Sequence, residues 1–240
     1  MRKITIKKIK ELYFELQDRG LAFYWQRKSH NSQLNGHVLM YHHITNENVD
    51  IIPSCIRTPE QFIAGLEKER KDGYTFISVN EFIDINPKFY SKKFSLVTFD
   101  DVPANFLIGA YPYLKANQIP FVLFITTGFL SDSTYLSKEQ ILELDKDSLC
   151  TIGAHSVTHP MLRCCEDPFK EILDSKLELE NILGHQVNVM AYPYGKHSSI
   201  SRHIRKLAAK AGYKCAFSTI DAPISTCSYK SRYFIPRVIV

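Results

Sequence analysis

The sequence predicts an α/β domain in which short buried strands alternate with amphipathic helices, and we expect it to close into a single (β/α) barrel. β-branched and aromatic runs recur along the chain, helix-like periodic segments lie between them, and acids or histidines directly follow several of the runs. At 240 residues with 45% hydrophobic composition, the chain can form one well-packed domain and leaves little for a second.

The expected elements follow one another in order. Strands are expected at residues 37–41, 74–78, 95–99, 120–126, 150–154, 187–191 and 214–218, with a last strand between Arg232 and the chain end. Helices are expected at residues 58–70, 79–85, 111–115, 137–144, 167–183 and 201–212. The first of these helices has the clearest signals, with Thr58 as N-cap, Pro59 in the first turn and Gly73 beyond its end.

Residues 1–35 are expected to form an N-terminal amphipathic helix and a polar linker, ahead of the barrel domain at residues 36–240. The apolar face of this helix is expected to pack on the domain. A peripheral membrane contact remains an alternative, because basic residues gather at its start. The residues concerned are Arg2, Lys3, Lys7, Lys8 and Lys10, with Ile6, Ile9, Tyr13 and Leu16 on the apolar face.

Composition restricts the partners and the compartment. A net charge of +5 without interleaved basic and aromatic patches gives no support to nucleic-acid binding. The six cysteines form no Cys-x-x-Cys pair, so reduced thiols are expected. Neither a signal peptide nor an apolar run long enough to span a membrane is seen, which favours a cytoplasmic address with membrane-peripheral placement as the alternative.

Two pairs of polar residues stand where predicted strands end. Asp100 and Asp101 close one strand, and His155 follows another, with His159 four residues later. Histidines at this spacing share one face of a helical turn, and strand ends of a barrel meet at one rim. One Asp and two His would leave a fourth position for water, as in catalytic zinc sites, with the neighbouring carboxylate as base. An Asp pair that merely opens a turn, with histidines spaced by chance, is the alternative.

Three ordered motifs, Thr98-Phe-Asp-Asp101, His155-Ser-Val-Thr-His159 and Tyr192-Pro-Tyr-Gly195, resemble those of the polysaccharide deacetylases (NodB-homology domains, carbohydrate esterase family four). The resemblance spans about residues 36–240 and implies a distorted barrel of about seven strands. It implies metal-dependent removal of N-acetyl groups from an amino sugar in a polysaccharide, oligosaccharide or glycan precursor, with release of acetate.

The resemblance also assigns roles to single residues. It implies that Asp101, His155 and His159 hold a divalent ion, zinc with cobalt or nickel as alternatives, and that Asp100 is the general base. Tyr41-His-His-Ile44 is similar to the opening of the circularly permuted poly-N-acetylglucosamine deacetylases, which implies His42 as general acid. Tyr194 is implied to stabilise the oxyanion through its backbone N–H. The residues expected to contact substrate are Tyr192, Pro193 and Arg237, with a structural ion pair as an equal alternative for Arg237.

Two positions depart from the family pattern. Val102 stands where Gly usually follows the acids, and Ala191 stands where many members have an Arg that orients the base. Asp100 therefore needs another partner, which the sequence does not identify. Two other functions remain open, a non-catalytic carbohydrate-binding module on the same scaffold and an O-acetyl esterase.

Overall fold

Seven parallel strands close into a barrel in the computed structural model, which describes residues 6–30, 32–47, 49, 52 and 55–240. The ring runs β1-β10-β9-β8-β7-β6-β5, and pairing of β1 with β5 closes it. A short outer strand, β4 (Thr75–Phe76), pairs with β5. The strands of the ring are β1 (Asn35–Tyr41), β5 (Lys93–Asp100), β6 (Phe121–Ile125), β7 (Cys150–Ala154), β8 (Val189–Ala191), β9 (Cys215–Asp221) and β10 (Ile235–Ile239).

The prediction of a distorted barrel with about seven strands is confirmed. The distortion has two visible sources. Strands β7 and β8 pair in register only at Ala154 and Met190, and the register of β10 against β9 shifts between Ile235 and Arg237. Both irregularities lie in the half of the ring formed by the later strands.

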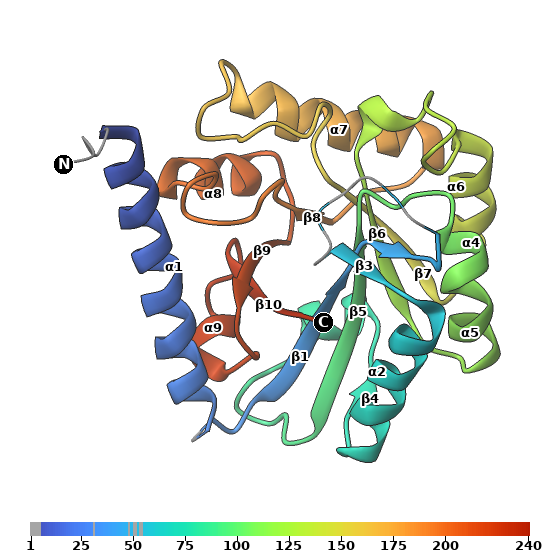
Figure 1. The fold of residues 1–240 in the computed structure, drawn as a ribbon, viewed down its shortest axis with the longest axis horizontal. Helices are drawn as coiled ribbons and strands as arrows, with labels where there is room; N and C mark the ends of the chain where they lie inside the picture. Colours follow the sequence, from blue (N-terminus) through green and yellow to red (C-terminus); the bar gives the residue numbers. More distant parts are fainter. Residues whose placement is uncertain (1–5, 31, 48, 50–51, 53–54) are drawn as a thin grey trace.

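Helices cover the outside of the barrel (Figure 1). Several begin with side-chain caps that the sequence indicates, such as the capping boxes of Thr58 with Gln61 and of Ser137 with Gln140. The helices are α1 (Ile6–Ser29), α2 (Pro59–Lys71), α3 (Val79–Asp84), α4 (Phe106–Gly109), α5 (Tyr111–Ala116), α6 (Lys138–Asp145), α7 (Pro168–Leu183), α8 (Arg202–Lys210) and α9 (Thr226–Tyr229).

The elements that the sequence did not predict are the shortest. They are the two-stranded sheet of β2 (His43–Ile44) and β3 (Ile56–Arg57), the 3-10 turn η2 (Thr127–Phe129), and helices α4 and α9. Segments of this length are too short to show a hydrophobic period, which explains why pattern reading missed them.

Alternation along the strands divides the core into two layers. Leu96 lies with Phe124 and Phe217 in a cluster shared by strands all around the ring, which is the barrel interior. Val97 and Phe99, the neighbours of opposite parity, pack outward in the cluster that includes the helices. Asp100 has the parity of Leu96, so this carboxylate is directed toward the inside of the barrel at its carboxyl end.

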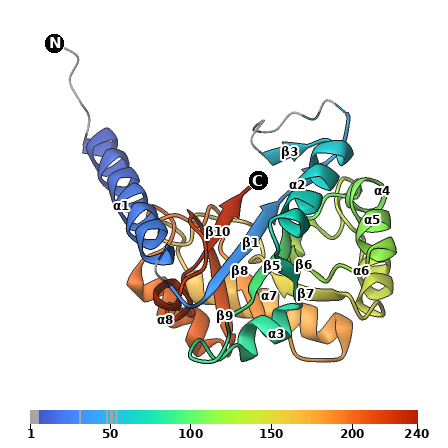
Figure 2. The ribbon, with the colours of Figure 1, turned by 90° about the horizontal axis from the view of Figure 1, so that it is seen from below.

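Helix α1 packs on the barrel through its C-terminal half. Trp25 is 3% exposed and its ring contacts that of Phe234, with centroids 6.2 Å apart. The N-terminal half stands away from the barrel (Figure 2), and four of its apolar side chains are more than half exposed, whereas Phe14 is half-buried beneath Arg163. The four exposed residues are Ile9, Leu12, Tyr13 and Leu16.

The expectation that the apolar face of α1 packs on the domain is therefore wrong for Ile9, Tyr13 and Leu16. Arg2 and Lys3 lie outside the described residues, and the membrane contact stays a prediction. In the part of the chain that the structure describes, no helix is long and apolar enough to cross a bilayer.

Trp25→Ala tests whether α1 is an integral part of the fold. We expect the free energy of unfolding to fall by about 3 to 5 kcal/mol, because removal of a buried aromatic side chain leaves a cavity. Urea denaturation followed by circular dichroism would measure it. Phe23→Ala is the matched control, since Phe23 is 65% exposed on the same helix, and should cost less than about 0.5 kcal/mol. Equal losses in the two variants would contradict the docking of α1.

Candidate metal and catalytic site

A cavity of about 480 Å³ opens where the ring strands end. Each wall residue of interest comes from the end of a strand or the loop that follows it, as a (β/α) barrel dictates. The cavity thereby collects the predicted catalytic and metal-binding residues from distant parts of the sequence. They are His42, Asp100, Asp101, His155, His159 and Tyr194.

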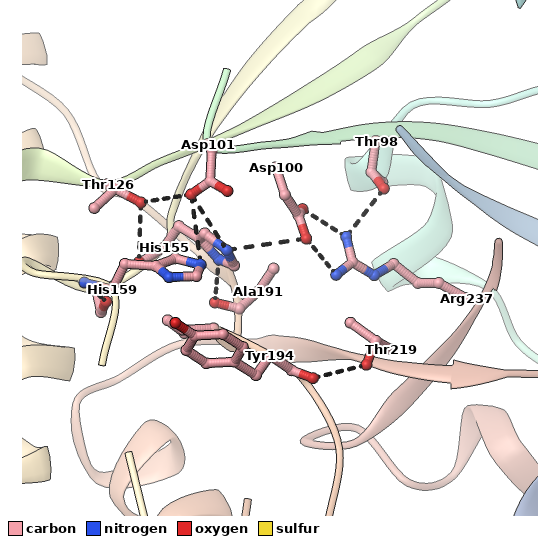
Figure 3. A network of polar contacts seen from close by, with 12 residues as sticks. Thr98, Asp100, Asp101, Thr126, His155, His159, Ala191, Tyr194, Thr219 and Arg237 are labelled. Atoms are coloured by element: carbon pink, nitrogen blue, oxygen red, sulfur yellow. Dashed lines mark hydrogen bonds and ion pairs between the residues drawn. The ribbon is translucent and has the colours of Figure 1, made fainter. Parts of the chain in front are cut away.

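Asp101, His155 and His159 form a compact donor set. Oδ1 of Asp101 lies 3.5 Å from Nε2 of His159 and 3.9 Å from Nε2 of His155 (Figure 3). One ligand atom from each of the three residues lies within 4.8 Å of the others. Thr126 helps to fix the Asp101 carboxylate, because its hydroxyl donates to Asp101 Oδ1 at 3.1 Å.

The tautomer of His155 suits a metal ligand. Nδ1 lies 2.9 Å from the backbone oxygen of Ala191, so Nδ1 carries the proton and Nε2 faces the donor set with a free lone pair. Burial lowers the pKa of His155, against the opposing effect of the Asp100 and Asp101 carboxylates. A neutral imidazole is the form that binds metal.

His159 reaches the site from a loop, so the predicted helical turn is wrong. Residues 155–160 follow β7 without forming a helix, and both Ser156 and His159 have positive φ, 65° and 55°. The His159 N–H donates to Ser156 Oγ at 3.1 Å. The Glu171 carboxylate of α7 accepts the N–H groups of Val157 and Thr158, each at 2.9 Å. Hydrogen bonds from a neighbouring helix, rather than helical periodicity, bring the second imidazole to the first.

The residues present fit a divalent metal ion. Two imidazole nitrogens and one carboxylate oxygen converge on one point and leave room on the cavity side, which is the donor set of catalytic rather than structural zinc sites. Cobalt and nickel accept the same donors.

Asp100 has a partner that the sequence did not reveal. Arg237 of β10 binds it through two parallel hydrogen bonds, Nη1 to Oδ1 and Nη2 to Oδ2, both 2.6 Å (Figure 3). Nε of Arg237 donates to the Ser218 oxygen at 2.8 Å, and Nη1 reaches Thr98 Oγ1 at 3.3 Å. Burial alone would raise the pKa of Asp100, but the Arg237 charge outweighs it and holds that pKa well below its ordinary value.

The predicted substrate contacts lie elsewhere than expected. Arg237 is fully buried behind Asp100, so we assign it to positioning the acid rather than to binding substrate. Tyr192 is also fully buried and donates its hydroxyl to the Tyr233 oxygen. Pro193 is buried beside it, where its oxygen accepts the Ser199 hydroxyl. The cavity wall is instead formed in part by residues that no motif marked, including Tyr135, Lys196 and Thr219.

The remaining two predicted catalytic residues both face the cavity with free hydrogen-bonding capacity. Among the described residues, the His42 ring has no hydrogen-bond partner; burial lowers its pKa, while the Asp100 and Asp101 charges oppose that shift. Tyr194 has a φ of 60°, and Thr219 fixes its loop by donating its hydroxyl to the Tyr194 oxygen at 2.9 Å. No atom of the described chain accepts the Tyr194 N–H, so this donor is available to a ligand.

Metal binding should separate the two adjacent acids. Asp101→Asn is expected to lose the ion, because it removes a charged ligand, whereas Asp100→Asn should keep it. Elemental analysis after incubation with zinc and removal of loosely held ions would measure one ion per chain or none. His155→Ala should behave as Asp101→Asn does, and His185→Ala, an exposed histidine that contacts Asp145 outside the cavity, is the control. Equal metal loss in the two acid variants would refute this division of labour.

Arg237→Gln should lower stability by about 3 to 5 kcal/mol at neutral pH, because it leaves the buried Asp100 charge without its partner. The wild-type pKa of Asp100 is depressed, so its stabilising contribution is complete above the ordinary carboxyl pKa of about 3.9 and is lost only as pH falls through the lower native value.

Without Arg237, burial raises that native pKa, so the stability gap between the two proteins should shrink as pH falls through the raised value. Urea denaturation across pH measures this gap. Arg237→Gln combined with Asp100→Asn should recover part of the loss. A gap that is independent of pH would mean that Arg237 acts only through packing.

Comparisons with known proteins agree with this geometry. The family model described as polysaccharide deacetylase matches residues 89–216, more than half of the chain. YxkH of Bacillus subtilis strain 168, which carries the name of a polysaccharide deacetylase, is 26% identical over 208 residues, covering 85% of this chain and 70% of YxkH.

Two solved structures share the fold with similar identity. The deacetylase PplD of Streptococcus pyogenes, in complex with acetate, is 26% identical with a TM-score of 0.74, over 85% of this chain and 92% of PplD. The polysaccharide deacetylase BC0361 from Bacillus cereus is 25% identical with a TM-score of 0.74, over 85% of this chain and 64% of BC0361, so the chain spans less than two thirds of that protein.

The family match covers the Asp-Asp motif, the histidine loop and the Tyr194 loop, and the fold places these three motifs around one cavity. The chain therefore belongs to the polysaccharide deacetylase family.

Proposed function

We propose that the protein hydrolyses the N-acetyl group of an amino sugar in a polysaccharide or related glycan, with a divalent ion, and releases acetate. The observation that carries this proposal is the pair of neighbouring acids with different partners in one cavity. Asp101 belongs to the two-histidine donor set, while Asp100 is bound to Arg237. Metal-dependent hydrolysis of an amide needs both functions close together, a ligand set and a separate base.

A divalent ion held by Asp101, His155 and His159 would supply Lewis acidity, which acidifies water and polarises a carbonyl. Asp100 is placed to take the proton from the attacking water, since its Oδ2 lies 4.0 Å from Nε2 of His155 at the same cavity. Arg237 keeps this carboxylate ionised and oriented. The depressed pKa also weakens Asp100 as a base, so the acidity that a bound ion would give to water has to compensate.

The two ends of the scissile bond would meet different donors. The free N–H of Tyr194 is suited to stabilise the developing oxyanion, a contact typically worth about 3 kcal/mol. His42 would give a proton to the departing amine, which is a poor leaving group until it is protonated. His42 has no protein hydrogen bond to break first among the described residues.

The ion pair of Arg237 with Asp100 also bears on the alternative of a non-catalytic binding module. That alternative rested mainly on Ala191, which removes the usual orienting Arg from the base. Arg237 supplies an equivalent charge from β10, so the base does not lack its partner. Hydrolysis of O-acetyl esters remains a second candidate because the same cavity would accept that carbonyl.

Acetate release from N-acetylglucosamine oligomers by the zinc-loaded protein tests the proposed reaction. Asp100→Asn is expected to keep its metal and to lose about 10² to 10⁴ in turnover, the usual contribution of a general base. Parallel assays with O-acetylated xylan separate amide from ester hydrolysis. Absence of acetate from N-acetylated substrates, with release from esters, would replace the proposal by the esterase.

His42→Asn tests the proton donor through the leaving group. We expect a loss of about 10² or more in turnover on N-acetylated sugars, because the amine must be protonated to leave. Hydrolysis of 4-nitrophenyl acetate should change far less, because its phenolate leaves without a proton. His43→Asn is the matched control, a neighbouring cavity histidine that contacts Asn105. Equal loss on both substrates would mean that His42 is not the acid.

A further inference from the structure

A second groove, of about 460 Å³, lies between α8 and the turn that joins α9 to β10. Its wall residues include five cationic side chains and no carboxylate: Arg202, Arg205, Lys206, Lys230 and Arg232. None of these five makes an ion pair with a described residue, although Arg232 donates Nη1 to the Ile83 oxygen at 2.9 Å and lies over the Tyr229 ring. Groups of like charge repel one another in the absence of a counter-ion, so this groove is arranged for an anion.

Three of these cations lie near the N-terminus of α8, where the helix dipole disfavours positive charge. Arg202, Arg205 and Lys206 occupy the N-terminal half of the helix, whose first turn contains no acid. The positive end of the helix dipole lies there, so cations are disfavoured and anions are stabilised. Cations at a helix N-terminus without neighbouring carboxylates conflict with the helix dipole, and local conflicts of this kind commonly occur at binding sites.

Arg205 is the most constrained of the five. Its guanidinium lies 3.7 Å from the centroid of the Phe234 ring, and its Nε is buried without a hydrogen-bond partner in the described chain. Burial lowers the pKa of Arg205, and the charges of Arg163 and Arg202 act in the same direction. The stacked Phe234 ring and the His197 contact hold this guanidinium against the wall of the groove.

The groove is connected to the catalytic cavity by one short loop. Lys196 lines the cavity, and the adjacent His197 contacts Arg205, with Nε2 3.4 Å from Nη2. The start of α8 therefore adjoins the loop that forms one wall of the cavity, whereas Lys230 and Arg232, which precede β10, line the part of the groove farther from it. A lipid bilayer is broad and flat, whereas this site is a groove between a helix and a turn, which suits a chain that carries charged groups.

We propose that this groove binds the anionic groups, phosphate or carboxylate, of a glycan chain and so selects acidic polysaccharides. The identification of the ligand as a glycan rests on the proposed function, whereas the anion site itself rests on the five unpaired cations. The ligand would be held by charge-assisted hydrogen bonds from guanidinium and ammonium groups.

The test uses one oligosaccharide backbone in three forms: a fluorescent chito-oligosaccharide that is unmodified, partly phosphorylated or partly carboxymethylated. Fluorescence anisotropy gives the dissociation constant of each with the wild-type chain. We expect tighter binding of at least one acidic form, and this advantage should decline between 50 and 200 mM salt, roughly as screening predicts. The form that gains more identifies the anion as phosphate or carboxylate.

Two variants on opposite walls of the groove assign the binding to it. Arg202→Gln with Lys206→Gln should weaken binding of the acidic form about tenfold or more, and Lys230→Gln by a smaller factor, because each removes a charged donor. The matched control, Lys138→Gln with Lys146→Gln, removes the same charge from α6 on the other side of the barrel (Figure 1). The unmodified oligosaccharide should bind all variants alike.

The proposal is overturned if neither acidic form binds better than the unmodified one, or if the groove variants match the α6 control. It is also overturned if a single-stranded RNA homopolymer or phosphatidylglycerol vesicles bind the wild type as tightly as the acidic oligosaccharide does, with the same loss in the groove variants. Acetate release, measured on the same proteins, is a separate readout. Groove-dependent binding without acetate release would refute the proposed reaction and keep the anion site.

Discussion

The buried pair of Arg237 and Asp100 is the interaction on which the site depends. It joins β10 to β5 across the interior of the barrel, although β1 separates these two strands in the ring. Both side chains are almost without solvent exposure, so their charges are desolvated and each compensates the other. A buried ion pair gives uncertain net stability relative to an apolar pair. Its persistence at this point is better explained by chemistry, since it holds a carboxylate ionised at the floor of a cavity.

Two adjacent acids acquire different roles because the strand ends between them. Asp100 keeps the inward parity of β5, whereas Asp101 has a φ of 59° and turns toward His155 and His159. Val102 follows with a φ of 45°, a conformation in which a β-branched residue is strained and in which Gly would be free. The positive φ at this position explains why family members usually have Gly there. The strain here is one of several at the rim, since Ser156, His159 and Tyr194 also have positive φ.

Sequence reasoning reached the barrel and the ordered motifs because both are encoded locally. Strand composition, caps and polar residues at strand ends are visible within a few positions. Sequence reasoning did not identify contacts that depend on the register between strands far apart in the chain. The partner of Asp100 is 137 residues away in the chain and faces it only because β10 lies two strands from β5 in a closed ring. The motif predicts Tyr192 and Pro193 as substrate contacts, but only Tyr194 of that motif lines the cavity. The Pro and Gly mark a turn there without indicating which side chain faces the cavity, and Tyr194 has a φ of 60°.

The segment before residue 36 belongs to this network as well. His197 follows the cavity residue Lys196 and is held by Asp18 of α1, whose carboxylate accepts from the His197 backbone at 3.0 Å and lies 2.6 Å from its Nδ1. The same ring packs on Phe234 and contacts Arg205 of the cationic groove. A single loop, 194–201, thus touches the catalytic cavity, the groove and α1. If residues 1–35 were treated as an extension separate from an independent barrel, Asp18 would be assigned to a different unit from the loop that it holds. The packing of α1 therefore contributes to the geometry of the site itself.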